Sequence, residues 1–210
     1  TPVPGLVHRF PDRVLVMVAR DCAMRCRHCT RKNTLEGCPV VKGRTALAAA
    51  VKYVREHVEV REVILSGGDP LLLSDKELIT LVEAFKTLPG VDAVRIGTRV
   101  PSVLPMRITT SLARALGRGG RLWLNTQFNH SIELTRESAA ACARLANAGI
   151  PLSNQSVLLA GVNDSVGEMA ALCRGLQRMR VRPYYVFQCD PVTGSLHFRV
   201  PLPKAKRIAR

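Results

Sequence analysis

The chain has 210 residues and 47% of them are hydrophobic, so it can bury a substantial core and is not intrinsically disordered. It has no apolar run of the roughly 18 residues that a membrane span needs and no signal segment, so we expect a cytoplasmic protein. The net charge of +15 suggests a nucleic-acid partner, but the basic residues are scattered and aromatic residues make up only 4%, which disfavours one.

Hydrophobic periodicity predicts alternating strands and helices. The run RVLVMVA at 13–19 is almost continuously apolar, which is typical of a strand covered on both faces. Further strands are predicted at 62–66, 91–98, 121–126, 151–158 and 181–187, and helices at 45–57, 74–88, 109–116, 135–148 and 165–179. Ser74 and Glu77 form a capping box, and Gly149 suits a helix end. The chain starts at Thr1 and stops at PKAKRIAR, where another helix begins, so we expect a fragment of a longer protein.

Six strands separated by helices predict a parallel sheet in an α/β fold. Its shape could be an open doubly wound sheet or a partial (βα)6 barrel. Polar segments follow most strands, at 22–31, 66–70, 125–130, 154–156 and 188–190. Because ligand sites of parallel α/β folds lie at the carboxyl ends of the strands, these segments predict one shared site and favour the partial barrel.

The stretch CAMRCRHC places Cys22, Cys26 and Cys29 on one loop after the first predicted strand. Seven cysteines are an odd number, which disfavours a disulfide framework. A structural zinc site takes four ligands, and Cys38 could supply the fourth. Three thiolates can instead anchor three irons of a [4Fe-4S] cluster and leave the remaining iron open to another ligand. We favour the cluster.

This cysteine spacing in a six-fold βα chain resembles the radical S-adenosylmethionine superfamily. The resemblance implies that His28 packs near the adenine of S-adenosylmethionine. It also implies that Gly67, Gly68 and Asp69, in LSGGDPLLLSD, hold the amino group of that cofactor. Without the resemblance, the two glycines would indicate only a tight turn between a strand and a helix.

A closer resemblance is carried by seven segments, PVPGLVHRFPDRV, CRHCTRK, LSGGDPLLLSD, RIGTRVPSVLPMRIT, NTQFNH, NQSVLLAGVND and RPYYVFQCD. Together they resemble the lysine 2,3-aminomutase family, and they imply that residues 1–210 form a radical S-adenosylmethionine core domain without the flanking regions. The resemblance implies that Arg31 binds the substrate carboxylate, a task that suits a guanidinium, and that Asp190 binds the distal ammonium. It assigns Arg9, Arg13 and Gln155 to the surroundings of pyridoxal 5′-phosphate. Taken alone, Arg9 and Arg31 would be surface charges and Asp190 a turn residue.

The sequence departs from the family pattern at three points. The lysine that binds pyridoxal phosphate and a second substrate aspartate would lie beyond residue 210. Gln127, in NTQFNH, stands where the family has a histidine. The first two departures agree with a fragment that has no turnover alone, and the third puts one local contact in doubt.

The expected activity is the conversion of L-lysine to L-β-lysine through a 5′-deoxyadenosyl radical, with a [4Fe-4S] cluster, S-adenosylmethionine and pyridoxal 5′-phosphate as cofactors. L-lysine and a one-electron reductant such as flavodoxin or ferredoxin are the expected partners, and the sequence leaves a homo-oligomer open. The alternatives are the related enzyme that makes β-lysine for a translation elongation factor, a glutamate-acting relative, and a basic RNA-binding or RNA-modifying protein. Ordinary burial is the expected role of the other cysteines, Cys38, Cys142, Cys173 and Cys189.

Overall fold

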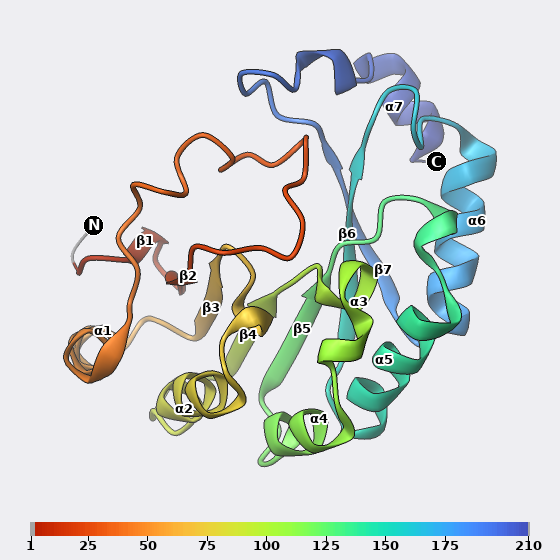
Figure 1. Ribbon diagram of the computed structural model, residues 1–210. Coiled ribbons are helices and arrows are strands. Elements are labelled where there is room, and N and C mark those ends of the chain that lie inside the picture. The colour runs from red at the N-terminus through yellow and green to blue at the C-terminus, as the bar shows by residue number, and fades with distance from the viewer. Residues whose placement is uncertain (1–2, 210) are drawn as a thin grey trace.

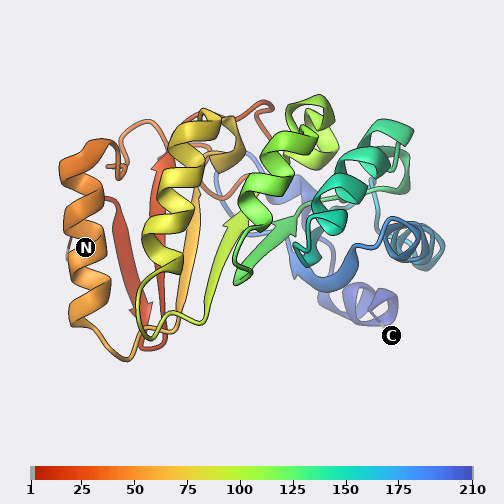
Figure 2. The ribbon, with the colours of Figure 1, turned by 90° about the horizontal axis from the view of Figure 1, so that it is seen from below.

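The structure, a computed structural model, describes residues 3–209. A curved seven-stranded sheet carries its helices on the outer side (Figure 1), and the view from below in Figure 2 shows them as one layer against the strands. The strands are β1 (Leu6–Phe10), β2 (Arg13–Ala19), β3 (Glu62–Gly67), β4 (Ala93–Gly97), β5 (Leu122–Thr126), β6 (Leu152–Leu158) and β7 (Arg182–Gln188). The helices are α1 (Gly43–Glu56), α2 (Asp75–Lys86), the short α3 (Val100–Val103), α4 (Thr110–Gly117), α5 (Arg136–Asn147), α6 (Val166–Arg178) and α7 (Leu202–Ile208).

The strands follow one another in chain order across the sheet, from β1 to β7. Strands β2 to β7 pair in parallel, and β1 pairs antiparallel with β2. Within residues 3–209, no ladder joins β1 to β7, so the sheet curves without closing. The six parallel strands with their crossover helices form the partial (βα)6 barrel that the sequence predicts.

The predicted strands and helices are confirmed, with boundaries that differ from the observed ones by at most two residues. The sequence did not predict β1 or α3. Strand β1 has the sequence LVHRF and a mostly exposed burial pattern, so it lacks the apolar run that marks the central strands. Helix α7 continues the helical start that the C-terminal residues suggest.

The core lies between the outer face of the sheet and the helices. Alternate strand residues and one face of each helix supply it, because both elements are apolar only on the side that they bury. Its largest fully buried side chains are Phe85, Phe128, Leu6, Leu65, Leu71, Leu78, Ile96, Ile108, Leu112, Leu116, Leu124 and Leu145. Among the described helices, none combines the length and the apolar character that crossing a lipid bilayer requires.

Candidate functional site

A cavity of about 250 Å³ opens at the carboxyl ends of the parallel strands. Residues at the ends of β3 to β6 line it together with the segment that follows β2. We call that segment, residues 20–42, the cysteine loop; it contains no regular helix or strand. The strands meet at this edge because they are parallel, so side chains that are far apart in sequence line one space.

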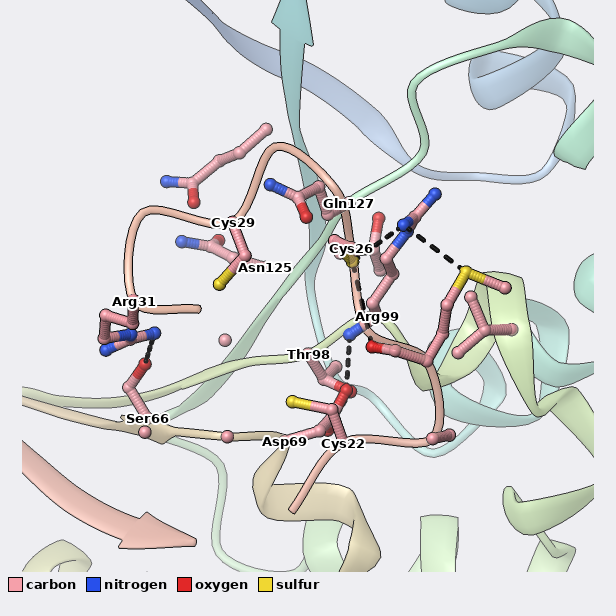
Figure 3. Close-up of a pocket in the computed structure, with 18 of the residues that line it drawn as sticks. Cys22, Cys26, Cys29, Arg31, Ser66, Asp69, Thr98, Arg99, Asn125 and Gln127 are labelled. Carbon is pink, nitrogen blue, oxygen red and sulfur yellow. Dashed lines mark hydrogen bonds between the residues drawn. The ribbon is translucent and has the colours of Figure 1, made fainter. Parts of the chain in front are cut away.

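The cysteine loop is fixed at both ends. Its backbone returns to the sheet where the Val41 N–H donates to the Met17 carbonyl at 2.7 Å, and the Arg20 Nε donates to the Cys38 carbonyl at 2.9 Å. Between these points, Cys22, Cys26 and Cys29 all line the cavity. Figure 3 shows the side chains of Cys22 and Cys29 directed into the same space, with Cys26 beside Arg99.

All seven cysteines are free thiols. The pKa of Cys22 is raised to about 11, chiefly because burial disfavours the thiolate, and the nearby Asp69 carboxylate adds to the effect. The Cys22 thiol is therefore protonated at neutral pH until a positive ion lowers its pKa. Cys38, the candidate fourth zinc ligand, does not line the cavity.

The glycine motif after β3 lies against the start of the cysteine loop. The Gly68 N–H donates to the Ala19 carbonyl at 2.7 Å, and the Asp69 N–H donates to the Asp21 carbonyl at 2.8 Å. The Asp69 carboxylate accepts from the Thr98 hydroxyl at 2.6 Å, from the Arg99 N–H at 2.7 Å and from the Leu71 N–H at 3.1 Å. These hydrogen bonds connect the end of β3 to the end of β4 through the Asp69 carboxylate. Burial raises the pKa of Asp69.

Arg31 lies on the opposite side of the cavity from Arg99 (Figure 3). Its Nη2 donates to the Ser66 hydroxyl at 3.1 Å, and its Nη1 lies 3.7 Å from the Met17 sulfur. Neither contact neutralises the guanidinium, so Arg31 retains its charge for an anionic ligand.

Arg99 follows β4 and is the other cationic side chain of the cavity. Its Nη1 donates to the Cys26 sulfur at 2.9 Å, and its Nη2 pairs with Glu133 Oε1 at 3.2 Å. Burial works to lower the pKa of Arg99, but the neighbouring Cys26 and Glu133 outweigh it and the pKa is raised. The guanidinium is therefore fixed as a cation beside a candidate cluster ligand.

His28 is part of the cysteine loop and lines the cavity. Its Nε2 is buried and finds no hydrogen-bond partner among the described residues, which leaves a polar atom for a ligand to satisfy. Burial, together with the charge of Arg99, lowers the pKa of His28, so the ring is neutral at pH 7. Gln127 and Gln155 both line the cavity.

Three predicted site residues lie outside the cavity. Arg9 is exposed on β1, and Arg13 starts β2 at the opposite edge of the sheet, where it pairs with Asp12 at 2.8 Å and with Glu62 at 3.6 Å. Asp190 is exposed two residues after β7, at the same edge as the cysteine loop. The roles assigned to Arg9, Arg13 and Asp190 stay predictions.

The end of the chain approaches the cysteine loop. Arg27 lies 3.5 Å from the His197 ring and stacks over Phe198, with 5.2 Å between the guanidinium carbon and the ring centre. The segment that follows β7 therefore contacts the cysteine loop at Arg27. This later segment does not itself line the cavity.

The comparisons with known proteins agree with this geometry. A family model described as "Radical SAM superfamily" matches residues 16–173, which is most of the chain. The chain belongs to the radical SAM superfamily. Native anSMEcpe with bound AdoMet and a Cp18Cys peptide has a similar fold, with a TM-score of 0.68 and 13% sequence identity over 94% of this chain and 58% of that one.

Among curated relatives, the L-lysine 2,3-aminomutase of Acetoanaerobium sticklandii is 49% identical over 208 residues, which are 99% of this chain and 50% of the relative. The glutamate 2,3-aminomutase of Clostridioides difficile is 41% identical over 94% of this chain and 47% of the relative. The chain thus spans about half the length of the curated relatives that it matches.

The cavity suits the two cofactors that the radical SAM superfamily implies. Three thiols surround one space without converging on a point: within residues 3–209, no three metal-ligating side chains are grouped closely enough for a single ion. Iron–sulfur clusters are held by cysteine thiolates, which this cavity offers, and the buried His28 Nε2 without a partner offers a polar contact to a ligand. The residues that would hold the cluster are Cys22, Cys26 and Cys29.

Sequence reasoning missed Arg99, Thr98 and Glu133. Thr98 and Arg99 directly follow β4, so the rule that site residues follow parallel strands could have found them, as it found the segments after the other strands. Glu133 lies outside any strand end and meets Arg99 only through the path of the chain after β5. Nothing in its local sequence marks it as a residue of this radical SAM site.

Proposed function

We propose that this chain forms the catalytic core domain of an aminomutase that moves the α-amino group of L-lysine to the β-carbon. The observation that carries the proposal is one cavity in which a three-cysteine loop, a glycine motif and an uncompensated arginine face one another. The 49% identity with an L-lysine 2,3-aminomutase over nearly the whole chain supports lysine over glutamate as the substrate.

The radical SAM cofactors would be held by the cysteine loop and by the end of β3. Cys22, Cys26 and Cys29 would ligate the cluster, and Gly67, Gly68 and Asp69, which line the same cavity, would hold the amino group of S-adenosylmethionine. When bound, these cofactors supply a radical strong enough to remove hydrogen from an unactivated carbon. His28 would contact the adenine from the rim of the cavity.

The substrate would be oriented by charge at its two ends. Arg31 can donate two parallel hydrogen bonds to the α-carboxylate, because Ser66 occupies only part of its donor capacity. Asp190 would attract the distal ammonium of lysine and repel the side-chain carboxylate of glutamate. Arg9, Arg13 and Gln155 are proposed to bind pyridoxal phosphate, and the lysine that holds it covalently is expected outside this chain.

The substrate is tested by an anaerobic assay of the purified protein in its full length. L-lysine is supplied with S-adenosylmethionine, pyridoxal phosphate and dithionite, and L-β-lysine is detected by mass spectrometry. We expect β-lysine formation, and we expect Asp190→Ala to raise the KM for lysine at least tenfold. Production of β-glutamate from glutamate, with no β-lysine from lysine, would refute the substrate assignment.

The cluster is tested by the iron content after anaerobic reconstitution. We expect Cys22→Ala, Cys26→Ala and Cys29→Ala to lose most of the iron, while Cys38→Ala serves as the matched control on the same loop and retains it. A Cys26→Ala variant with full iron content would contradict the cluster ligands proposed here.

The seven free thiols favour a reducing compartment, so we infer that the protein works in the cytoplasm. There, a flavodoxin or ferredoxin would supply the electron that the cluster needs. Pull-down of a flavodoxin by the cluster-loaded protein checks the identity of this donor.

A further inference from the structure

Arg99 divides its hydrogen bonds in an unusual way. Its Nη1 donates to the Cys26 sulfur at 2.9 Å (Figure 3) and lies 3.8 Å from the Met24 sulfur, while its Nη2 donates to Glu133. Its Nε is buried and has no partner among the described residues. A side chain that served only to pair with Glu133 would be expected to use Nε and Nη2 together, as paired arginines commonly do.

The guanidinium of Arg99 is fixed from two directions. Glu133 accepts from the Ser102 hydroxyl at 2.6 Å and from the Asn129 N–H at 3.4 Å, so the carboxylate that orients Arg99 is itself oriented. The Arg99 backbone N–H donates to Asp69 at 2.7 Å, which fixes the base of the side chain. The Arg99 side chain is only 16% exposed, so water screens its charge weakly.

Arg99 contacts only one of the three cysteines of the loop among the described residues. In the described part of the chain, neither Cys22 nor Cys29 has a side-chain hydrogen bond to its sulfur, whereas Cys26 receives one from a fixed cation. Arg99 also lies 73 residues from Cys26 in sequence, so this contact depends on the fold and not on the motif of the cysteine loop.

We propose that Arg99 is a positioning residue that donates a charged hydrogen bond to the Cys26 thiolate and makes the cluster easier to reduce. The cluster gains one electron from a one-electron reductant, and a nearby positive charge stabilises the added negative charge. Hydrogen bonds to ligand sulfurs are among the factors that set the potentials of iron–sulfur clusters. The inference rests on the cluster of the proposed function and is independent of the substrate.

The test is a redox titration of the cluster-loaded protein without substrate, followed by electron paramagnetic resonance. Arg99→Gln is compared with Arg25→Gln, which removes the same charge from the cysteine loop at a side chain that is 90% exposed. At the wild-type midpoint, we expect the ratio of reduced to oxidised cluster to fall about tenfold in Arg99→Gln, or about 59 mV for one electron, and to stay unchanged in Arg25→Gln.

Arg99→Lys keeps the positive charge, so this variant tests the proposal if Arg99→Gln does not take up iron. We expect a smaller fall, about threefold, together with loss of the magnetic coupling between the reduced cluster and a ¹⁵N-labelled arginine. The inference would be overturned if Arg99→Lys showed the wild-type ratio of reduced to oxidised cluster and the wild-type protein showed no magnetic coupling to the labelled arginine. Equal shifts of this ratio in Arg99→Gln and Arg25→Gln would also overturn it. Wild-type protein that binds no iron would refute the proposed function instead.

Discussion

Gly67 and Gly68 lie where the end of β3 presses against the chain that leads into the cysteine loop. Gly67 has a φ of +114°, and a Cβ there would lie 2.3 Å from the Ala19 carbonyl oxygen. A Cβ on Gly68 would lie 2.3 Å from the Asp21 carbonyl oxygen. The motif is therefore both the tight turn and the wall of the proposed cofactor site, and the two interpretations of its glycines are compatible.

We expect Gly67→Ala to lower the free energy of unfolding by roughly 2 to 4 kcal/mol, because the new methyl group meets backbone that cannot move freely and the φ is unfavourable. Gly167→Ala in α6 is the matched control, since a Cβ there meets no atom within 4 Å and alanine favours helices. Urea denaturation measures both variants. Equal stability of the two would contradict the crowding argument.

Burial raises the pKa of Cys142 to about 12. The pKa of Cys142 in the folded protein therefore lies above its unfolded value of about 8.5. As the pH rises, the folded protein keeps the neutral thiol, and the free energy of unfolding falls only once the pH exceeds that unfolded value. We expect iodoacetamide at pH 8 to modify Cys142 at least a hundredfold more slowly in the native protein than in urea. Peptide mass spectrometry gives both rates, and comparable rates would show that this thiol is accessible.

At the scale of the secondary-structure elements, α2 begins with a complete capping box. The Glu77 N–H donates to the Ser74 hydroxyl at 3.3 Å, and the Glu77 carboxylate accepts from the Ser74 N–H at 3.2 Å. We expect Ser74→Ala to lower the free energy of unfolding by about 1 kcal/mol. Thr80→Ala within the same helix should be neutral or stabilising, since alanine favours helix interiors. Thermal unfolding of the two variants checks the contrast, and an effect from Thr80→Ala alone would contradict it.

The strands and helices were predictable from the sequence where burial gives their apolar residues a clear pattern. Strand β2 shows almost no polar interruption because most of its side chains are buried, and α2 shows its cap directly in sequence. Strand β1 was not predictable, because an antiparallel edge strand with exposed residues needs no apolar run.

The site was predictable as far as its residues form local motifs. The cysteines, His28 and the glycine motif are each contiguous, and parallel strands bring them together. The contact between Arg99 and Cys26 was not predictable, since it depends on how far the cysteine loop reaches across the strand ends and on the carboxylate that turns the guanidinium.

For the whole molecule, the open sheet predicts a gradient of stability. The central strands are buried on their outer face, as Leu65, Ile96 and Leu124 show, whereas the side chains of 184–187 in β7 are all exposed. In the 210-residue chain we expect the amides of β7 to exchange with deuterium at least tenfold faster than those of β4. Exchange followed by mass spectrometry tests this, and equal protection would mean that another part of the molecule covers β7.

The cysteine loop is closed by contacts of the protein chain alone. The hydrogen bonds of Val41 to Met17 and of Arg20 to Cys38 bring both ends of the loop together. The spacing of the three thiols therefore depends on residues at both ends of the loop, and a change at either end would shift the three sulfur atoms together.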